Sequence, residues 1–159
     1  MSRIYLASSW RNEHQPRVVA LLRGAGHEVY DFKNPRPGET GFSWREVDPD
    51  WATWTPYGFV AGLKHPTARA GFRSDFDAMQ WADTCVLLLP SGPSAAIEAG
   101  WCKGSGRRLI VYVAGMREPD LMYSMADDFV FTDEGLVNAV QEIRPLGPNI
   151  GCFSEVPRG

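Results

Sequence analysis

Two short, almost uninterrupted apolar segments most constrain what this chain can fold into: residues 84–89 and residues 109–113. Strands of this composition are covered on both faces, which is typical of the centre of a parallel sheet. Both segments are far too short to span a membrane as helices. The chain therefore needs helices above and below a sheet that contains these two strands.

The remaining pattern supplies those helices. Three more short strands are expected at 3–7, 27–31 and 129–131, and helical periodicity is expected at 12–24, 55–63, 66–82, 95–103 and 132–143. Alternating strands and helices predict one α/β domain, a flavodoxin-like (Rossmann-like) three-layer sandwich of about five parallel strands in the order 2-1-3-4-5. Ligands of such sheets bind beyond the carboxyl ends of the strands, which here are the loops 8–12, 90–94 and 114–120.

One domain of 159 residues leaves two irregular parts, a segment at about 33–55 and a tail from residue 145. The first part contains Trp44, Trp51 and Trp54, which argues against disorder. We expect an ordered flap over a binding site. The alternative is a loop whose tryptophans pack on the core or on another subunit.

Composition excludes several classes of partner. The net charge of −3 argues against a nucleic acid or an anionic membrane as the main partner, but allows a small anionic ligand. The three cysteines and three histidines are scattered, so neither a disulfide framework nor a metal site is predicted, and no cofactor is expected. Without a recognisable signal peptide, the expected location is the cytoplasm.

Glu98 is the first candidate catalytic residue. It lies about one turn inside the helix that follows the central strand, and Ser91 or Ser94 could cap that helix. The free N–H groups at the helix start would form an anion site. Apolar neighbours should remove water from Glu98 and raise its pKa, which suits a nucleophile. The alternative is an ordinary helix glutamate bonded to a loop amide.

Asp75 is the second candidate. It lies at the margin of the helix stripe that we expect to be buried, which consists of Phe72, Phe76 and Met79. Two carboxylates beside one bond are what glycoside cleavage needs, because one attacks the anomeric carbon and the other handles a proton of the leaving group. The alternative for Asp75 is a boundary salt bridge with Arg69 or Arg73.

The loop after the first strand offers a third set of groups. Ser8, Trp10 and Arg11 supply a hydroxyl, an aromatic face and a guanidinium, which could hold a base, a sugar or a phosphate. The loop lacks glycine, so it is neither a dinucleotide fingerprint nor a P-loop. The alternative is a plain helix cap.

These residues together resemble the nucleoside 2-deoxyribosyltransferase family. The resemblance rests on residues 4–8, on Asp75 followed by 82–83 and an apolar strand, on 98–100, and on 118–122, and it spans most of 3–143. It implies a retaining double displacement in which Glu98 forms a covalent deoxyribosyl-enzyme and Asp75 helps to protonate the leaving base. Asp120 and Met122 match a segment that reaches into a neighbouring subunit's site, so a homo-oligomer, dimeric or larger, is implied.

Two positions depart from the family pattern. Gly92 stands where the family often has an acidic residue for the 5′-hydroxyl, and Asp120 stands where it usually has asparagine. Ser91, Gly92 and Ser94 instead resemble the 5′-phosphate loop of related nucleoside 5′-monophosphate N-glycosidases, which transfer the glycosyl group to water. Deoxyribosyl transfer between bases and hydrolysis of a (deoxy)nucleoside monophosphate therefore both remain open. A non-catalytic nucleotide-binding module is a third reading, and in each case the ligand is a small nucleoside or nucleotide.

Overall fold

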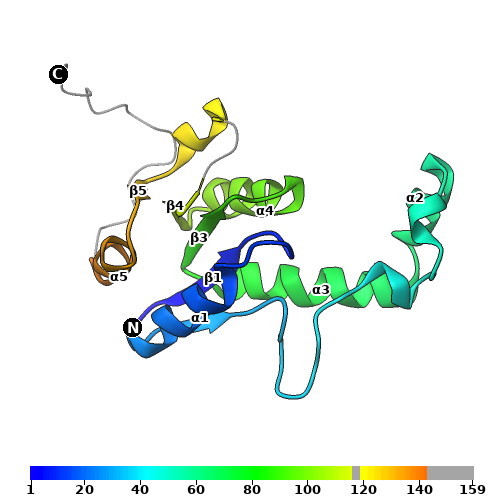
Figure 1. Ribbon diagram of the computed structural model, residues 1–159, viewed down its shortest axis with the longest axis horizontal. Coiled ribbons are helices and arrows are strands. Elements are labelled where there is room, and N and C mark those ends of the chain that lie inside the picture. The colour runs from blue at the N-terminus through cyan, green and yellow to red at the C-terminus, as the bar shows by residue number, and fades with distance from the viewer. Residues whose placement is uncertain (116–118, 143–159) are drawn as a thin grey trace.

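Five parallel strands form a single sheet in the order β2-β1-β3-β4-β5, as predicted (Figure 1). The structure is a computed structural model that describes residues 1–115 and 119–142. The strands are β1 (Arg3–Ala7), β2 (Glu28–Tyr30), β3 (Thr84–Leu89), β4 (Arg108–Val113) and β5 (Asp128–Val130). The flavodoxin-like fold class is confirmed. Three parts of the prediction lie outside the described residues: the tail, Cys152, and residues 116–118 of the loop predicted at 114–120.

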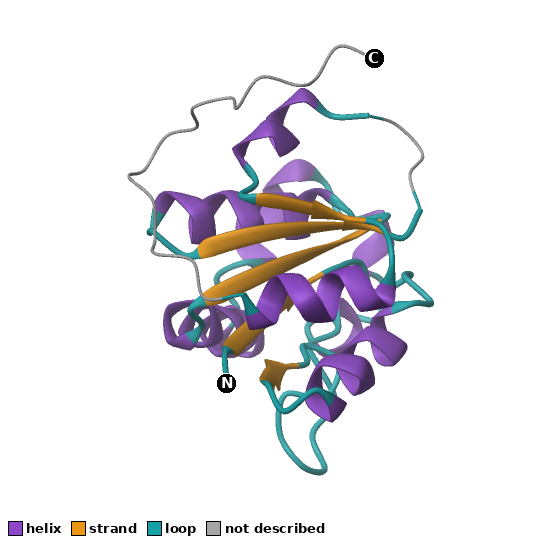
Figure 2. Ribbon diagram, turned by 90° about the vertical axis from the view of Figure 1, so that its left-hand side faces the viewer, coloured by secondary structure: helices purple, strands orange, loops and turns teal. Residues whose placement is uncertain are grey.

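Helices cover both faces of the sheet (Figure 2). One face packs against α1 (Gln15–Gly24) and α5 (Asp133–Gln141), and the other packs against α3 (Pro66–Trp81) and α4 (Pro93–Gly104). All six residues of β3 are buried. Val86 and Leu88 face α1 and α5, while Cys85, Leu87 and Leu89 face α3 and α4. Coverage on both faces is the reason for the unbroken apolar run.

Only part of α3 lies over the sheet, and this corrects one expectation. Met79 is buried as predicted, but Phe76 is half-buried and Phe72 is 67% exposed. The first half of α3 extends past the sheet toward α2 (Pro56–Gly62), as Figure 1 shows. Helical periodicity identifies the apolar side of a helix, but it does not reveal where the sheet beneath that side ends.

The segment between β2 and α2 contains two 3₁₀ helices, Trp44–Glu46 and Trp51–Thr53. Ser43 and Glu46 form a reciprocal capping box at the first of them. The ring of Trp44 lies edge-on to three others, with centroids 4.9 Å from Phe42, 5.5 Å from Trp54 and 6.1 Å from Phe59 of α2. The flap aromatics thus pack mainly on one another and on α2, outside the two core clusters of the sheet.

No helix in the described part of the chain is long and apolar enough to cross a bilayer.

Candidate active site

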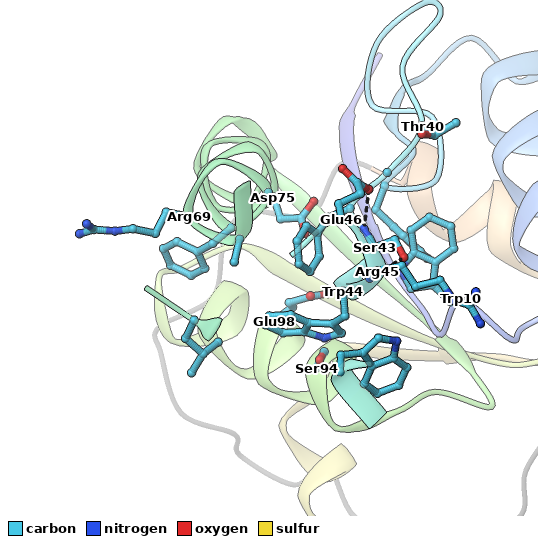
Figure 3. Close-up of a pocket in the computed structure, with 18 of the residues that line it drawn as sticks. Trp10, Thr40, Ser43, Trp44, Arg45, Glu46, Arg69, Asp75, Ser94 and Glu98 are labelled. Atoms are coloured by element: carbon cyan, nitrogen blue, oxygen red, sulfur yellow. Dashed lines mark hydrogen bonds between the residues drawn. The ribbon is translucent and has the colours of Figure 1, made fainter. Parts of the chain in front are cut away.

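One cavity of about 990 Å³ contains both candidate carboxylates (Figure 3). Its wall is formed by the loop after β1, the flap, α3 and the first turns of α4. The wall includes Ser8, Trp10, Phe42, Trp44, Arg45, Arg69, Phe72, Asp75, Ser94 and Glu98. The predicted edge of the sheet is therefore hollow, and the helices before and after β3 bring Asp75 and Glu98 to it.

Glu98 projects from the second turn of α4. Ala95 and Ala99 of the same helix are buried against the sheet, which leaves Glu98 half-buried at the edge of that contact. Burial raises the pKa of Glu98 to about 7, and the negative charge of Asp75 adds to the rise, while a hydrogen bond from Tyr5 opposes it. Near neutral pH this carboxyl can therefore exist in both its ionised and its protonated form.

Asp75 projects from α3, and burial raises its pKa as well. Its hydrogen-bond partner is the hydroxyl of Tyr30, which donates to Oδ1 at 2.8 Å and lowers the pKa in part. Neither Arg69 nor Arg73 forms an ion pair with Asp75, so within the described chain the boundary salt bridge is absent.

Two stacked tyrosines lie behind the carboxylates, and sequence reasoning missed both. Tyr5 of β1 and Tyr30 of β2 are register partners, and their rings are nearly parallel, at 12°, with centroids 5.6 Å apart. Tyr5 hydrogen-bonds Glu98 and Tyr30 hydrogen-bonds Asp75. The one available signal was Tyr5 in an otherwise apolar strand, because a buried tyrosine hydroxyl needs a partner.

Of the three site residues predicted in the loop after β1, two lie at the cavity. Ser8 and Trp10 line it, whereas the exposed side chain of Arg11 does not. The residue that fixes this loop is the buried Asn12, whose Nδ2 donates to the carbonyl oxygens of Leu88 and Pro90. The first loop is thereby tied to the end of β3, next to the start of α4.

The start of α4 differs from the prediction. Gly92, rather than Ser91 or Ser94, is the N-cap residue, and no side chain among the described residues caps this helix. The reason is Pro93, whose ring suits the first helical position and needs no N–H partner. Ser94 lines the cavity but Ser91 and Gly92 do not, and the buried Oγ of Ser91 has no hydrogen-bond partner within the described chain.

Asp120 and Met122 lie away from the cavity of their own chain. Asp120 accepts a hydrogen bond from the backbone N–H of Met122 at 2.8 Å and thereby caps the 3₁₀ helix Leu121–Met125. Met122 is 59% exposed. That these residues reach a neighbouring subunit's site stays a prediction.

The flap and α3 supply wall residues that were not among the predicted site residues. Phe42, Trp44 and Arg45 come from it, and Arg69 and Phe72 come from α3. Figure 3 shows Trp44 and Glu98 in the middle of the cavity, with Trp10 and Arg69 toward opposite sides. Aromatic faces and guanidinium groups are suited to a flat, polar or anionic ligand.

The cavity can support attack on an electrophilic carbon together with proton transfer, because it combines two partly desolvated carboxylates with neutral donors behind them. No group of three or more histidine, cysteine, aspartate or glutamate side chains that could hold a metal ion occurs among the described residues.

Comparisons with known proteins agree with the fold. No family model and no curated protein matches the chain. A solved structure of a 2-deoxyribosyltransferase from Bacillus psychrosaccharolyticus is similar over 89% of this chain and 97% of its own length, with a TM-score of 0.60 and 22% identity. A CMP N-glycosidase from Clostridium botulinum matches over 88% and 99%, with a TM-score of 0.47 and 15% identity. At 22% identity, the similarity to the 2-deoxyribosyltransferase establishes the flavodoxin-like fold alone. Nothing further is concluded from the CMP N-glycosidase.

Proposed function

We propose that this protein cleaves the N-glycosidic bond of a (deoxy)nucleoside through a covalent glycosyl-Glu98 intermediate and transfers the glycosyl group to another nucleobase. The observation that carries the proposal is the meeting of Glu98 and Asp75, from two different helices, in one cavity at the carboxyl edge of the sheet. The activity of the structurally similar 2-deoxyribosyltransferase supports the same chemistry.

In the first step, a carboxylate oxygen of Glu98 forms a bond to C1′ as the bond from C1′ to the base nitrogen breaks. The electron pair of the broken bond stays on the base, which receives the proton of Asp75. In the second step, a nitrogen of the incoming base attacks C1′ and the ester bond to Glu98 breaks. The proton of the incoming base then returns to Asp75, so the enzyme is restored.

The reactive form of the pair has Glu98 ionised and Asp75 protonated. Burial raises the pKa of both carboxyls, so a second negative charge is unfavourable and the two groups titrate as a pair. Tyr5 favours the ionised form of Glu98, because it donates a hydrogen bond to that carboxylate.

The direct test is Glu98→Ala, assayed for release of free base from a panel of deoxynucleosides. We expect base release to fall to the background rate while nucleoside binding and folding persist. Glu13→Ala, which removes an exposed glutamate, is the matched control and should retain full activity. Normal turnover by the Glu98 variant would end the nucleophile assignment.

A second candidate function is hydrolysis of (deoxy)nucleoside 5′-monophosphates, with water as the acceptor. It is favoured by the start of α4, where Ser94 lines the cavity and no side chain of the described residues caps the first N–H groups. N–H groups and hydroxyls at a helix start suit a phosphate. They would lie near the 5′ end of a nucleotide whose C1′ faces Glu98.

One set of incubations distinguishes these candidate functions. The protein is incubated with a deoxynucleoside or with its 5′-monophosphate, each with and without a second base. Exchange of base on the nucleoside supports the transferase, whereas base release from the monophosphate alone, without an acceptor, supports the hydrolase. Binding of nucleotide without base release from either substrate supports a non-catalytic module instead.

A further inference from the structure

Tyr30 contacts Asp75 without reaching the substrate cavity. It ends β2, and it is absent from the cavity wall that contains Asp75 and Glu98. Its hydroxyl donates to Asp75 Oδ1 at 2.8 Å and lies 3.0 Å from Ser74 Oγ. The stack on Tyr5 holds the ring in place. Tyr30 therefore does not touch the substrate, and its hydrogen bond to Asp75 is its direct link to the reaction.

This contact favours one protonation state of Asp75. A donor hydrogen bond stabilises a carboxylate more than a carboxylic acid, so Tyr30 lowers the pKa of Asp75, whereas burial raises it. Burial also raises the pKa of the Tyr30 hydroxyl, which consequently stays neutral and keeps its proton. Oδ1 is thereby occupied, and Oδ2 is the oxygen left to exchange a proton in the cavity.

We propose that Tyr30 is a positioning residue for the second half of the reaction, where it holds Asp75 ionised with Oδ2 ready to accept the proton of the acceptor. The inference rests on the proposed function. With water as acceptor, the oxygen bonds to C1′, the bond between C1′ and Glu98 breaks with its electrons returning to the carboxylate, and one water proton moves to Asp75. With a base as acceptor, the proton comes from its ring nitrogen.

Of the charged and titratable groups around Asp75 and Tyr30, Glu98 of α4 changes its charge between the two halves of the reaction. The others are Tyr5 from β1, Arg36, Arg45 and Glu46 from the segment between β2 and α2, and Arg69 from α3. In the covalent intermediate Glu98 is an ester and carries no charge, so its repulsion of Asp75 is lost. The hydrogen bond from Tyr30 then favours ionised Asp75 in the state that must accept a proton.

The test is Tyr30→Phe, which keeps the ring and removes the hydroxyl. Rapid mixing with a nucleoside should show a first turnover of base release close to the wild-type rate, followed by a steady-state rate about 10- to 100-fold lower, the effect expected from losing one hydrogen bond to a charged group. Intact-mass measurement should detect the accumulated glycosyl-enzyme. The slow phase should recover as pH rises, because the pKa of Asp75 is higher in this variant.

Tyr112→Phe is the matched control. Tyr112 also donates its hydroxyl to an aspartate, Asp133 at 2.6 Å, but neither residue belongs to the cavity wall. Removing this hydroxyl should leave both kinetic phases and their pH dependence unchanged. Thermal melts of both variants show whether either substitution alters folding.

Asp75→Asn provides a second variant that does not depend on Tyr30→Phe being well folded. It should show the same slow second step, and adding Tyr30→Phe to it should cause no further slowing of that step. An additional loss in the double variant would overturn the inference.

The inference also fails if Tyr30→Phe slows first-turnover and steady-state base release equally, or leaves both at the wild-type rate. Failure of the proposed function looks different, because the wild-type protein itself would then release no base from any nucleoside or nucleotide.

Discussion

Glu98 combines a reactive position with a cost in stability. Its pKa of about 7 in the folded chain lies above its ordinary value of 4.5, so the folded state holds this proton more tightly than the unfolded state does. The free energy of unfolding therefore falls as pH rises from about 4.5 to about 7. By 1.36 kcal/mol per pKa unit, the loss is up to about 3 kcal/mol.

Glu98→Gln should remove this pH dependence, since an amide does not ionise. We expect the variant to be more stable than the wild-type protein at pH 8 and close to it at pH 4.5, as measured by urea denaturation at both values. Glu13→Gln, at an exposed position, should follow the wild-type curve. If Glu98→Gln loses as much stability as the wild-type protein between these pH values, the raised pKa is refuted.

The same pKa predicts the pH dependence of activity. A nucleophile must be ionised, so kcat/KM should rise with pH. The midpoint of this rise should give an apparent pKa near 7, which describes the carboxylate pair as a whole. Tyr5→Phe removes a hydrogen bond that lowers this pKa, so the midpoint of the pH profile should move to higher pH. An unchanged midpoint would show that Tyr5 does not bond the ionised form of Glu98.

Asp75→Asn tests the proton donor in the first step. It should slow base release most for bases that leave poorly without a proton, and least for bases that leave readily as anions. Single-turnover rates across a series of bases measure how the loss depends on the leaving base. An equal loss for every base would argue against proton donation by Asp75.

At the scale of elements, the close approach of α3 to the flap controls the shape of the cavity. A Cβ on Gly71 of α3 would lie 2.9 Å from Phe42 Cβ, and further atoms of that ring lie within 3.1 Å. Phe42 would have to move, and the cavity wall that it shares with Trp44 would move with it. Close packing of this kind explains a glycine in the middle of a helix.

Gly71→Ala should therefore raise KM or lower kcat for the nucleoside about tenfold or more, as expected when a wall residue is displaced by about 1 Å. Gly100→Ala is the matched helix-interior control, because Met125 Cε, 4.0 Å away, is the one described atom that the added Cβ would contact. That control should keep its kinetics and gain roughly 0.5–1 kcal/mol in helix stability. Unchanged kinetics of Gly71→Ala would mean that the flap adapts freely.

At the scale of the whole molecule, apolar side chains remain exposed on α4 and the neighbouring 3₁₀ helix. Ile97 is 73% exposed, Leu121 83% and Met122 59%. A patch of this kind on a small domain is typical of an interaction surface. It coincides with the segment that the family resemblance assigns to subunit contacts, so we predict that the protein is a homo-oligomer through this surface.

Leu121→Glu should shift the protein to smaller species in sedimentation velocity, because a carboxylate in an apolar interface loses its hydration. Tyr57→Glu on α2, also strongly exposed, is the control and should leave the assembly unchanged. A wild-type protein that sediments as a monomer at all concentrations would contradict the prediction.

Local patterns were sufficient for the order of the elements, the apolar centre of the sheet and the edge where Glu98 and Asp75 lie. Strand and helix periodicity report which side of an element is buried, and chain connectivity restricts a parallel sheet to few topologies. They also placed Ser8, Trp10 and Ser94 near the site. These features were accessible because each depends on residues close together in the sequence.

Only the tertiary structure decided the pairing of Tyr5 with Tyr30, the aromatic wall from the flap, the exposure of Phe72 and the position of Arg11 outside the cavity. Each of these depends on strand register, on where one element extends past another, or on how a loop closes over a helix. Such relations join residues far apart in the chain, and no local periodicity encodes them.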